Sequence, residues 1–220
     1  MEIILHKNLQ IYFGGTFDPP HNGHIRLCLY LADMFNCVIN LVINNGKPPY
    51  KHEAIATTQQ RLDMLQLLVN KYPRLLCIED IELQYNQYSP TINTVKMINA
   101  RHNCADLPYW VIGSDSFNNI KSWDNYQELV QISNFIVIPR DGFTINQNLA
   151  QDLYSNNIYY NEINITSEHA QLIILDKYIA DDISSTNIRK LIKSNRLSTD
   201  LIDNTTHTYI NNNKIYKGTI

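Results

Sequence analysis

The chain has 220 residues, of which 44% are hydrophobic and 18% are charged, and its formal net charge is −3. This length is typical of one domain that can bury a core of its own. The charge argues against nucleic acid as the main partner, because a nucleic-acid-binding surface is basic. A local group of residues can still hold a small anion.

Strand-like apolar runs alternate with helical patterns along the chain. The predicted strands are 11–13, 37–43, 75–79, 109–112, 135–138 and 172–175. The predicted helices are 23–35, 57–69, 92–102, 124–131, 149–154, 184–192 and about 198–211. Several strands are continuously apolar, as expected of parallel strands that are covered on both faces. The sequence therefore predicts an α/β fold with a doubly wound, mostly parallel sheet and helices at its C-terminal end.

The predicted organisation is a single domain over residues 1–220, with an α/β core over 1–183 and a helical part over 184–220. Thr57 and Gln60 form a possible capping box at one helix start, and Asp124 is the expected cap of another. The polar stretch 141–170 shows poor periodicity, and we expect a short helix followed by a loop there.

The cysteines and apolar runs indicate where the protein resides. Cys28, Cys37, Cys77 and Cys104 form no CxxC pair, and we expect buried free thiols. No apolar run approaches the roughly 18 residues of a membrane span, and no signal peptide is visible at the N-terminus. The sequence therefore predicts a cytoplasmic protein without a membrane partner.

Residues 14–24, Gly-Gly-Thr-Phe-Asp-Pro-Pro-His-Asn-Gly-His, are the most informative segment. Glycines at the end of a predicted strand let the backbone approach a phosphate, and the N–H groups of the following helix attract anions. His21 and His24 are one helical turn apart, so both can face one site. The alternatives are two structural histidines that cap a turn, or a metal pair with Asp18. The sequence contains no GxxxxGK(S/T) motif, and no GxGxxG motif follows the first strand, so these two other phosphate-binding motifs are absent.

A second segment, residues 183–189 (Ile-Ser-Ser-Thr-Asn-Ile-Arg), has the same chemical character. Ser185 and Thr186 lie at a predicted helix start, where hydroxyls and N–H groups can hold phosphate oxygens. Arg189 lies one turn later and can reach the same anion with its planar guanidinium. The alternative is an ordinary helix cap beside an exposed arginine.

These two segments resemble the HxGH and ISSTxxR signatures of the nucleotidylyltransferase superfamily, which implies its Rossmann-like fold. Further stretches resemble bacterial nicotinate-nucleotide adenylyltransferases, and this resemblance covers nearly the whole chain. They are 44–51 (NNGKPPYK), 61–65 (RLDML), 89–91 (SPT), 112–116 (IGSDS) and the surroundings of Trp123. Tyr50, Pro90 and Ile43 depart from the pattern of that family.

The resemblance implies transfer of the adenylyl group of ATP to nicotinate mononucleotide, which gives deamido-NAD and pyrophosphate in NAD biosynthesis. It implies His21, His24 and Arg189 as catalytic residues. The implied ATP-binding residues are Gly14, Gly15, Thr16, Phe17, His21, His24, Gly113, Asp115, Ile183, Ser185, Thr186 and Arg189. The implied mononucleotide-binding residues are Gly15, Thr16, Asn44, Lys51, Thr91 and Trp123.

Mg²⁺ is expected on the ATP phosphates, with no dedicated protein metal site. The expected partners are the two small substrates, and the expected assembly is a monomer or a homodimer. Trp123 is expected to stack on the pyridine ring, the alternative being a core tryptophan, and Asp115 has the alternative role of a helix cap. Lys51 and Arg61 either add positive charge or lie on the surface.

Two other functions stay open. One is an adenylyltransferase of the same fold that acts on nicotinamide mononucleotide or phosphopantetheine, or a related enzyme that uses a cytidine nucleotide. The other is a non-catalytic nucleotide-sensing module, which would be expected to lack a histidine of the pair or Arg189.

Overall fold

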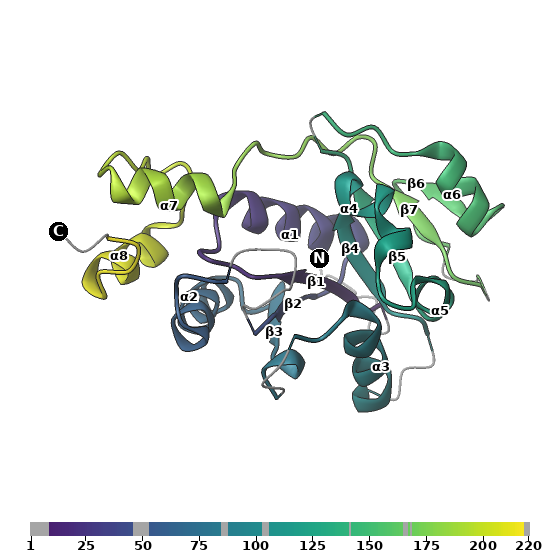
Figure 1. Ribbon diagram of the computed structural model, residues 1–220, viewed down its shortest axis with the longest axis horizontal. Helices are drawn as coiled ribbons and strands as arrows, with labels where there is room; N and C mark the ends of the chain where they lie inside the picture. The colour runs from purple at the N-terminus through teal and green to yellow at the C-terminus, as the bar shows by residue number, and fades with distance from the viewer. Residues whose placement is uncertain are drawn as a thin grey trace, which may run out of the picture. The chain divides into compact units, whose positions relative to one another are not determined.

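A computed structural model describes residues 9–45, 53–84, 88–102, 106–140, 142–164, 167 and 169–217 (Figure 1). The strands are β1 (Ile11–Gly15), β2 (Ile39–Ile43), β3 (Leu76–Glu79), β4 (Tyr109–Gly113), β5 (Asn134–Ile138), β6 (Ile158–Tyr160) and β7 (Leu172–Ile174). The helices are α1 (Asn22–Phe35), α2 (Thr58–Lys71), α3 (Thr91–His102), α4 (Ser114–Asn118), α5 (Tyr126–Ile132), α6 (Gln147–Tyr154), α7 (Ser185–Lys193) and α8 (Asn204–Asn212). Two short 3₁₀ turns are η1 (Ile81–Gln84) and η2 (Ile120–Ser122).

The strands form one sheet in the order β3-β2-β1-β4-β5-β7-β6. The pairs β1–β4, β2–β3, β4–β5, β5–β7 and β6–β7 are all parallel. The run 3-2-1-4-5 is the strand order of a doubly wound sheet, which places ligands beyond the carboxyl ends of the strands. The predicted fold class is therefore confirmed.

Contacts between Cα atoms divide the chain into two compact units. Unit 1 contains residues 15–88 and 181–220, and unit 2 contains residues 6–14 and 89–180, with residues 1–5 assigned to unit 1. The single-domain organisation predicted from the sequence stays a prediction.

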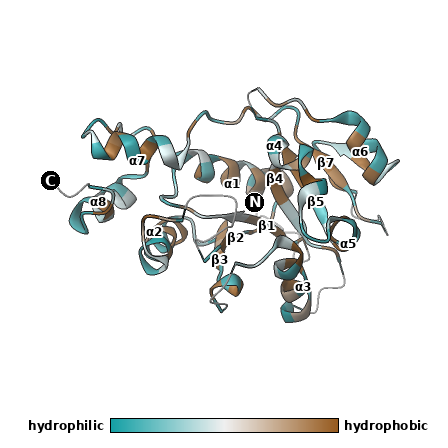
Figure 2. Ribbon diagram, in the orientation of Figure 1, coloured by the Kyte–Doolittle hydropathy of each residue, from teal (hydrophilic) through white to brown (hydrophobic). Residues whose placement is uncertain are grey.

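The core of unit 2 is built from its strands. All five residues of β5 and all three of β7 are buried, and Figure 2 colours β4, β5 and β7 largely hydrophobic. Strands buried along their whole length explain the continuously apolar runs in the sequence.

The core of unit 1 includes an apolar group, called here the tail cluster, that joins distant parts of the chain. Its members are Ala56, Met64, Ile188, Ile192, Ile202, Ile210, Ile215 and Tyr216. Helices α2 and α8 lie side by side within this unit (Figure 1). The segment from α7 to Tyr216 therefore contributes side chains to the core of unit 1.

Most predicted elements agree with the structure, and the Thr57–Gln60 capping box is confirmed. Helix α5 begins at Tyr126 after Asn125, so Asp124 is not its cap. Asn125 has a φ of 47°, in the left-handed region that asparagine tolerates well. Helix α8 begins at Asn204 rather than near 198, because Asp203 caps it by accepting from the Thr205 N–H at 2.9 Å.

Three further differences concern short or exposed segments. The loop expected after the helix near 149–154 contains β6, a three-residue strand at the sheet edge. Helix α4 was not predicted, because five residues are too few to show a helical period. Cys28 and Cys37 are buried free thiols as expected, but Cys77 on the edge strand β3 is exposed, and Cys104 lies outside the described residues.

Within the described part of the chain, no helix has the length and apolar character needed to cross a membrane.

Candidate active site

The loop between β1 and α1 folds back on itself in unit 1. Phe17 has a φ of 50° and is 2% exposed, so its ring is turned inward. A Cβ on Gly15 would lie 2.9 to 3.1 Å from that ring, which only glycine avoids. The Phe17 ring also meets the His24 ring edge-on, with centroids 5.1 Å apart. Phe17 therefore supports the orientation of His24.

His21 and His24 are locked together by a reciprocal capping box. His21 is the N-cap of α1, and its Nδ1 accepts from the His24 N–H at 3.4 Å. The Nδ1 of His24 accepts from the His21 N–H at 3.2 Å, and the two rings stack with centroids 3.5 Å apart. Because Nδ1 accepts in both rings, the neutral imidazoles carry their proton on Nε2. The capping role considered from the sequence is thus real, and it fixes the side of each ring that can donate.

The start of α7 docks on the same loop. The Ser185 hydroxyl donates to the Pro19 carbonyl at 2.9 Å. The Arg189 Nη1 donates to the Asp18 carbonyl at 2.6 Å, and Nη2 donates to the Thr186 hydroxyl at 3.2 Å. The Arg189 side chain is only 21% exposed, so the alternative of an arginine on the open surface is wrong. Two segments about 160 residues apart are therefore joined within unit 1.

Neighbouring contacts extend this junction along α1. The Asn22 N–H donates to the Leu201 carbonyl at 3.0 Å, and Arg26 pairs with Asp181 at 2.7 Å. A Cβ on Gly23 would lie 3.1 Å from the His21 ring. Ile183 packs against the tail cluster. The glycine of the HxGH segment thus leaves room for the first histidine.

The carboxyl end of β2 meets the same loop through Asn44. Its side-chain amide donates to the Thr16 hydroxyl at 3.1 Å, and its backbone N–H donates to the Gly15 carbonyl at 3.2 Å. The expected mononucleotide residues Gly15, Thr16 and Asn44 therefore lie together. Lys51 and Tyr50 lie outside the described residues.

Arg61 of α2 is fully buried and fixes these strand ends. Its Nη1 donates to the carbonyls of Thr16 and Asn44, each at 2.8 Å, and Nη2 donates to the Thr58 hydroxyl at 3.2 Å. Burial lowers the pKa of Arg61, while the charge of Asp18 acts to raise it. The surface role considered for Arg61 is wrong, because none of its surface is exposed. The sequence does not reveal this role, since buried arginines are rare.

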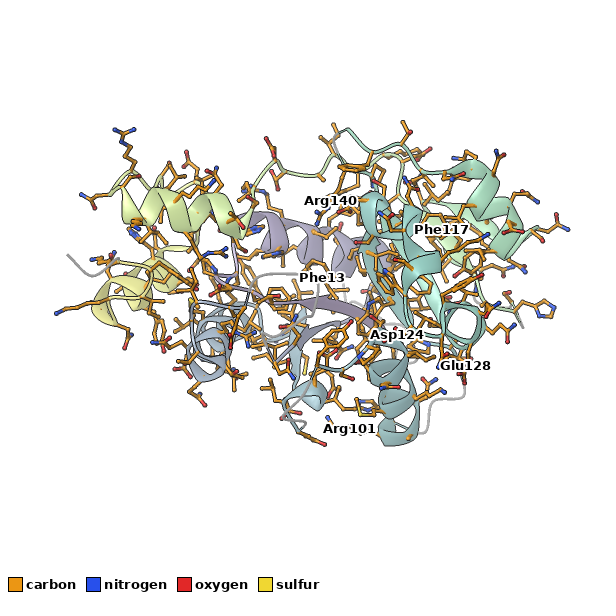
Figure 3. All side chains as sticks on the ribbon, viewed as in Figure 1. Phe13, Arg101, Phe117, Asp124, Glu128 and Arg140 are labelled. Atoms are coloured by element: carbon orange, nitrogen blue, oxygen red, sulfur yellow. The ribbon has the colours of Figure 1, made fainter. Side chains whose placement is uncertain are left out.

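In unit 2, Gly113 ends β4 and caps α4. A Cβ there would clash with Asp115 Oδ1 and would lie 2.7 Å from Arg140 Nε. Asp115 lies in the first turn of α4, and its Oδ2 is 3.5 Å from Arg140 Nη1. Asp115 is not the N-cap, because Gly113 holds that position. Arg140, labelled in Figure 3, is not among the residues predicted from the sequence. It lies just after β5, and the ends of parallel strands are where such a sheet binds ligands.

The remaining predicted residues of unit 2 lie at element ends. Gly14 lies in β1, where a Cβ would meet the Trp110 ring at 3.0 Å. Thr91 is the first residue of α3, and the preceding Pro90 carbonyl accepts from the Asn93 N–H at 2.9 Å. Trp123 follows η2 and is half-buried, so it is not a core tryptophan. Among the described residues, no group of three His, Cys, Asp or Glu side chains is arranged to bind a metal ion.

The chain is similar to known proteins over nearly its whole length. It matches the cytidylyltransferase-like family model over residues 12–191. It is 30% identical over 216 residues to a nicotinate-nucleotide adenylyltransferase of Escherichia coli O6:H1, which covers 96% of this chain and 100% of the relative.

Solved structures show the same fold. The nicotinic acid mononucleotide adenylyltransferase of Plasmodium falciparum complexed with NaAD gives a TM-score of 0.73 at 22% identity. The same protein complexed with APC gives 0.71 at 21% identity. In both cases the match covers 95% of this chain and 97% of the other.

Proposed function

The chain belongs to the cytidylyltransferase-like family and, within it, to the nicotinate-nucleotide adenylyltransferases, and we propose that it transfers the adenylyl group of ATP to nicotinate mononucleotide. The products are deamido-NAD and pyrophosphate, which places the reaction in NAD biosynthesis. The observation that carries the proposal is the docking of Ser185 and Arg189 on the loop that precedes His21.

That junction supports a phosphate site because its donors suit an anion. Imidazole N–H groups, hydroxyls and a guanidinium all donate to phosphate oxygens. We assign His21 and His24 to the α-phosphate and the transition state, with donation from Nε2. Ser185, Thr186 and Arg189 hold the phosphates that leave as pyrophosphate. Gly14, Gly15, Thr16, Phe17, Gly113, Asp115 and Ile183 are the other proposed ATP-binding residues.

The proposed chemistry needs no general base. The phosphate of a mononucleotide is largely dianionic at pH 7, since its second pKa is about 6. One of its oxygens attacks the α-phosphorus of ATP, a new P–O bond forms, and the bond to the β-phosphate oxygen breaks as pyrophosphate departs. The side chains contribute positioning and charge stabilisation, which account for most catalysis in phosphoryl-type transfer.

Magnesium enters this proposal as part of the substrate MgATP. The donors around the histidine loop are imidazoles, hydroxyls and a guanidinium, whereas Mg²⁺ prefers carboxylate, phosphate and water oxygens. The nearby carboxylate of Asp18 already accepts from the N–H groups of Ile55 and Ala56. The proposed ion is therefore held through the phosphates and neutralises their charge.

The mononucleotide contacts follow from the family resemblance. We propose that Gly15, Thr16 and Asn44 contact the mononucleotide, together with Lys51, Thr91 and Trp123. The exposed part of Trp123 suits stacking on the pyridine ring, and Thr91 at a helix start suits the carboxylate. A cytoplasmic location is also proposed, and the free thiols of Cys28, Cys37 and Cys77 suit a reducing compartment.

The decisive experiment measures pyrophosphate release from MgATP with nicotinate mononucleotide, nicotinamide mononucleotide or phosphopantetheine. The expected result is the highest kcat/KM with nicotinate mononucleotide. A higher kcat/KM with either other acceptor would reassign the substrate. Nucleotide binding without pyrophosphate release from any acceptor would favour a sensing module and contradict the proposal.

A further inference from the structure

The carboxylate of Asp18 contacts hydrogen-bond donors from three separate parts of unit 1. Oδ1 accepts from the Ala56 N–H at 3.0 Å and from the Tyr216 hydroxyl at 2.7 Å. Oδ2 accepts from the Ile55 N–H at 2.9 Å and lies 3.5 Å from Arg189 Nη1. Asp18 is 3% exposed, so these donors replace water around a buried charge.

Tyr216 is buried beside Asp18. It is 8% exposed and belongs to the tail cluster together with Ile188 and Ile192 of α7. Burial and the neighbouring charge of Asp18 raise the pKa of its phenol, so the hydroxyl stays protonated and donates. Tyr216 thus links the chain after α8 to the loop that carries the histidines.

Arg189 also contacts Asp18. Its Nη1 donates to the Asp18 carbonyl at 2.6 Å but is 3.5 Å from Asp18 Oδ2, which is longer than a direct charged hydrogen bond. A buried carboxylate that loses a donor attracts the nearest cation more strongly, because its charge is less well compensated. Without the Tyr216 hydroxyl, Asp18 would therefore draw the Arg189 guanidinium into a close ion pair.

We propose that Tyr216 is a positioning residue for adenylyl transfer: by donating to Asp18, it keeps the Arg189 guanidinium available to the phosphates of ATP. This inference rests on the proposed function and adds a residue that touches no substrate. It predicts that removal of the phenol hydroxyl lowers kcat/KM by more than any loss of stability explains.

The test begins with Tyr216→Phe, which keeps the ring in the tail cluster and removes only the hydroxyl. The matched control is Tyr209→Phe, because Tyr209 also donates to a carboxylate, Asp63, at 2.5 Å, and packs against the same cluster. We expect Tyr216→Phe to lower kcat/KM for ATP about tenfold, the effect of one hydrogen bond. Tyr209→Phe is expected to change it less than twofold, and urea midpoints measured for both variants report any effect on folding.

A double-mutant cycle separates positioning from general destabilisation. In an Arg189→Lys background, Tyr216→Phe is expected to change kcat/KM for ATP less than twofold, because the group it positions is already gone. The same tenfold loss in both backgrounds, or no loss in the otherwise wild-type protein, overturns the inference. Failure of the proposed function is a different result, since the wild-type protein would then release no pyrophosphate with any acceptor.

Discussion

Replacing Arg61 by lysine tests whether one buried guanidinium holds the strand ends around the candidate site. The substitution keeps the positive charge, but the shorter lysine does not bring its ammonium to the position of Nη1, which donates to the carbonyls of both Thr16 and Asn44. Those two bonds are each 2.8 Å long, and Arg61 is fully buried. Each hydrogen bond to a charged group is worth roughly 1.5–3 kcal/mol.

The expected loss is about 3 kcal/mol in the free energy of unfolding, because the lysine ammonium recovers part of the lost interaction. For a chain of this size that corresponds to a fall in Tm of roughly 6–12 °C. Urea unfolding followed by tryptophan fluorescence measures the change, with Gln66→Glu on the exposed face of α2 as a control substitution. A variant within about 0.5 kcal/mol of the wild-type protein, the usual range for surface changes, would refute the role assigned to Arg61.

Three further predictions concern the histidine pair, the tryptophan and one ion pair. His24→Ala is expected to lower kcat by about 100-fold with a smaller change in KM, and full activity would remove His24 from the mechanism. Trp123→Ala is expected to raise KM for the mononucleotide about tenfold, in line with base stacking; unchanged kinetics would assign Trp123 to packing alone. Lys71→Met is expected to cost about 0.5 kcal/mol at pH 7. The hydrogen bond to Asp203 raises the pKa of Lys71. Burial acts to raise the pKa of Asp203, but the hydrogen bonds from Lys71 and Thr205 outweigh it and lower that pKa. The ion pair therefore stabilises the folded state between about pH 4 and pH 10. Its contribution is lost in acid as Asp203 protonates and in base as Lys71 deprotonates. Equal urea midpoints at pH 7 for the wild-type protein and the Lys71→Met variant would contradict the prediction.

The sequence predicts the strands of this protein better than the contacts of its site. Strands such as β5 are buried along their whole length, so their apolar runs are visible without any tertiary information. The edge strand β6 escapes prediction because Tyr160 is exposed and the strand has only three residues. Local chemistry was also readable where it is self-contained, as in the Thr57 capping box.

The contacts that arrange the candidate site depend on residues far apart in the chain. His21 and Arg189 were predicted from two motifs, and the docking of α7 on the histidine loop supplies the geometry between them. Arg61 donates to backbone carbonyls, and Tyr216 donates to Asp18. No motif or residue spacing in the sequence identifies such partners. Asp18 itself was considered only as a metal ligand, whereas its carboxylate receives N–H and O–H donors.

The division of unit 1 between residues 15–88 and 181–220 has a consequence for how the protein is made. A ribosome that adds about 5–20 residues per second needs roughly 6–26 s to proceed from residue 88 to Tyr216. The nascent histidine loop lacks the Arg189 guanidinium until translation has passed residue 189, and it lacks the Tyr216 phenol until translation has passed residue 216. The set of contacts around the Asp18 carboxylate is therefore complete only after translation has passed Tyr216.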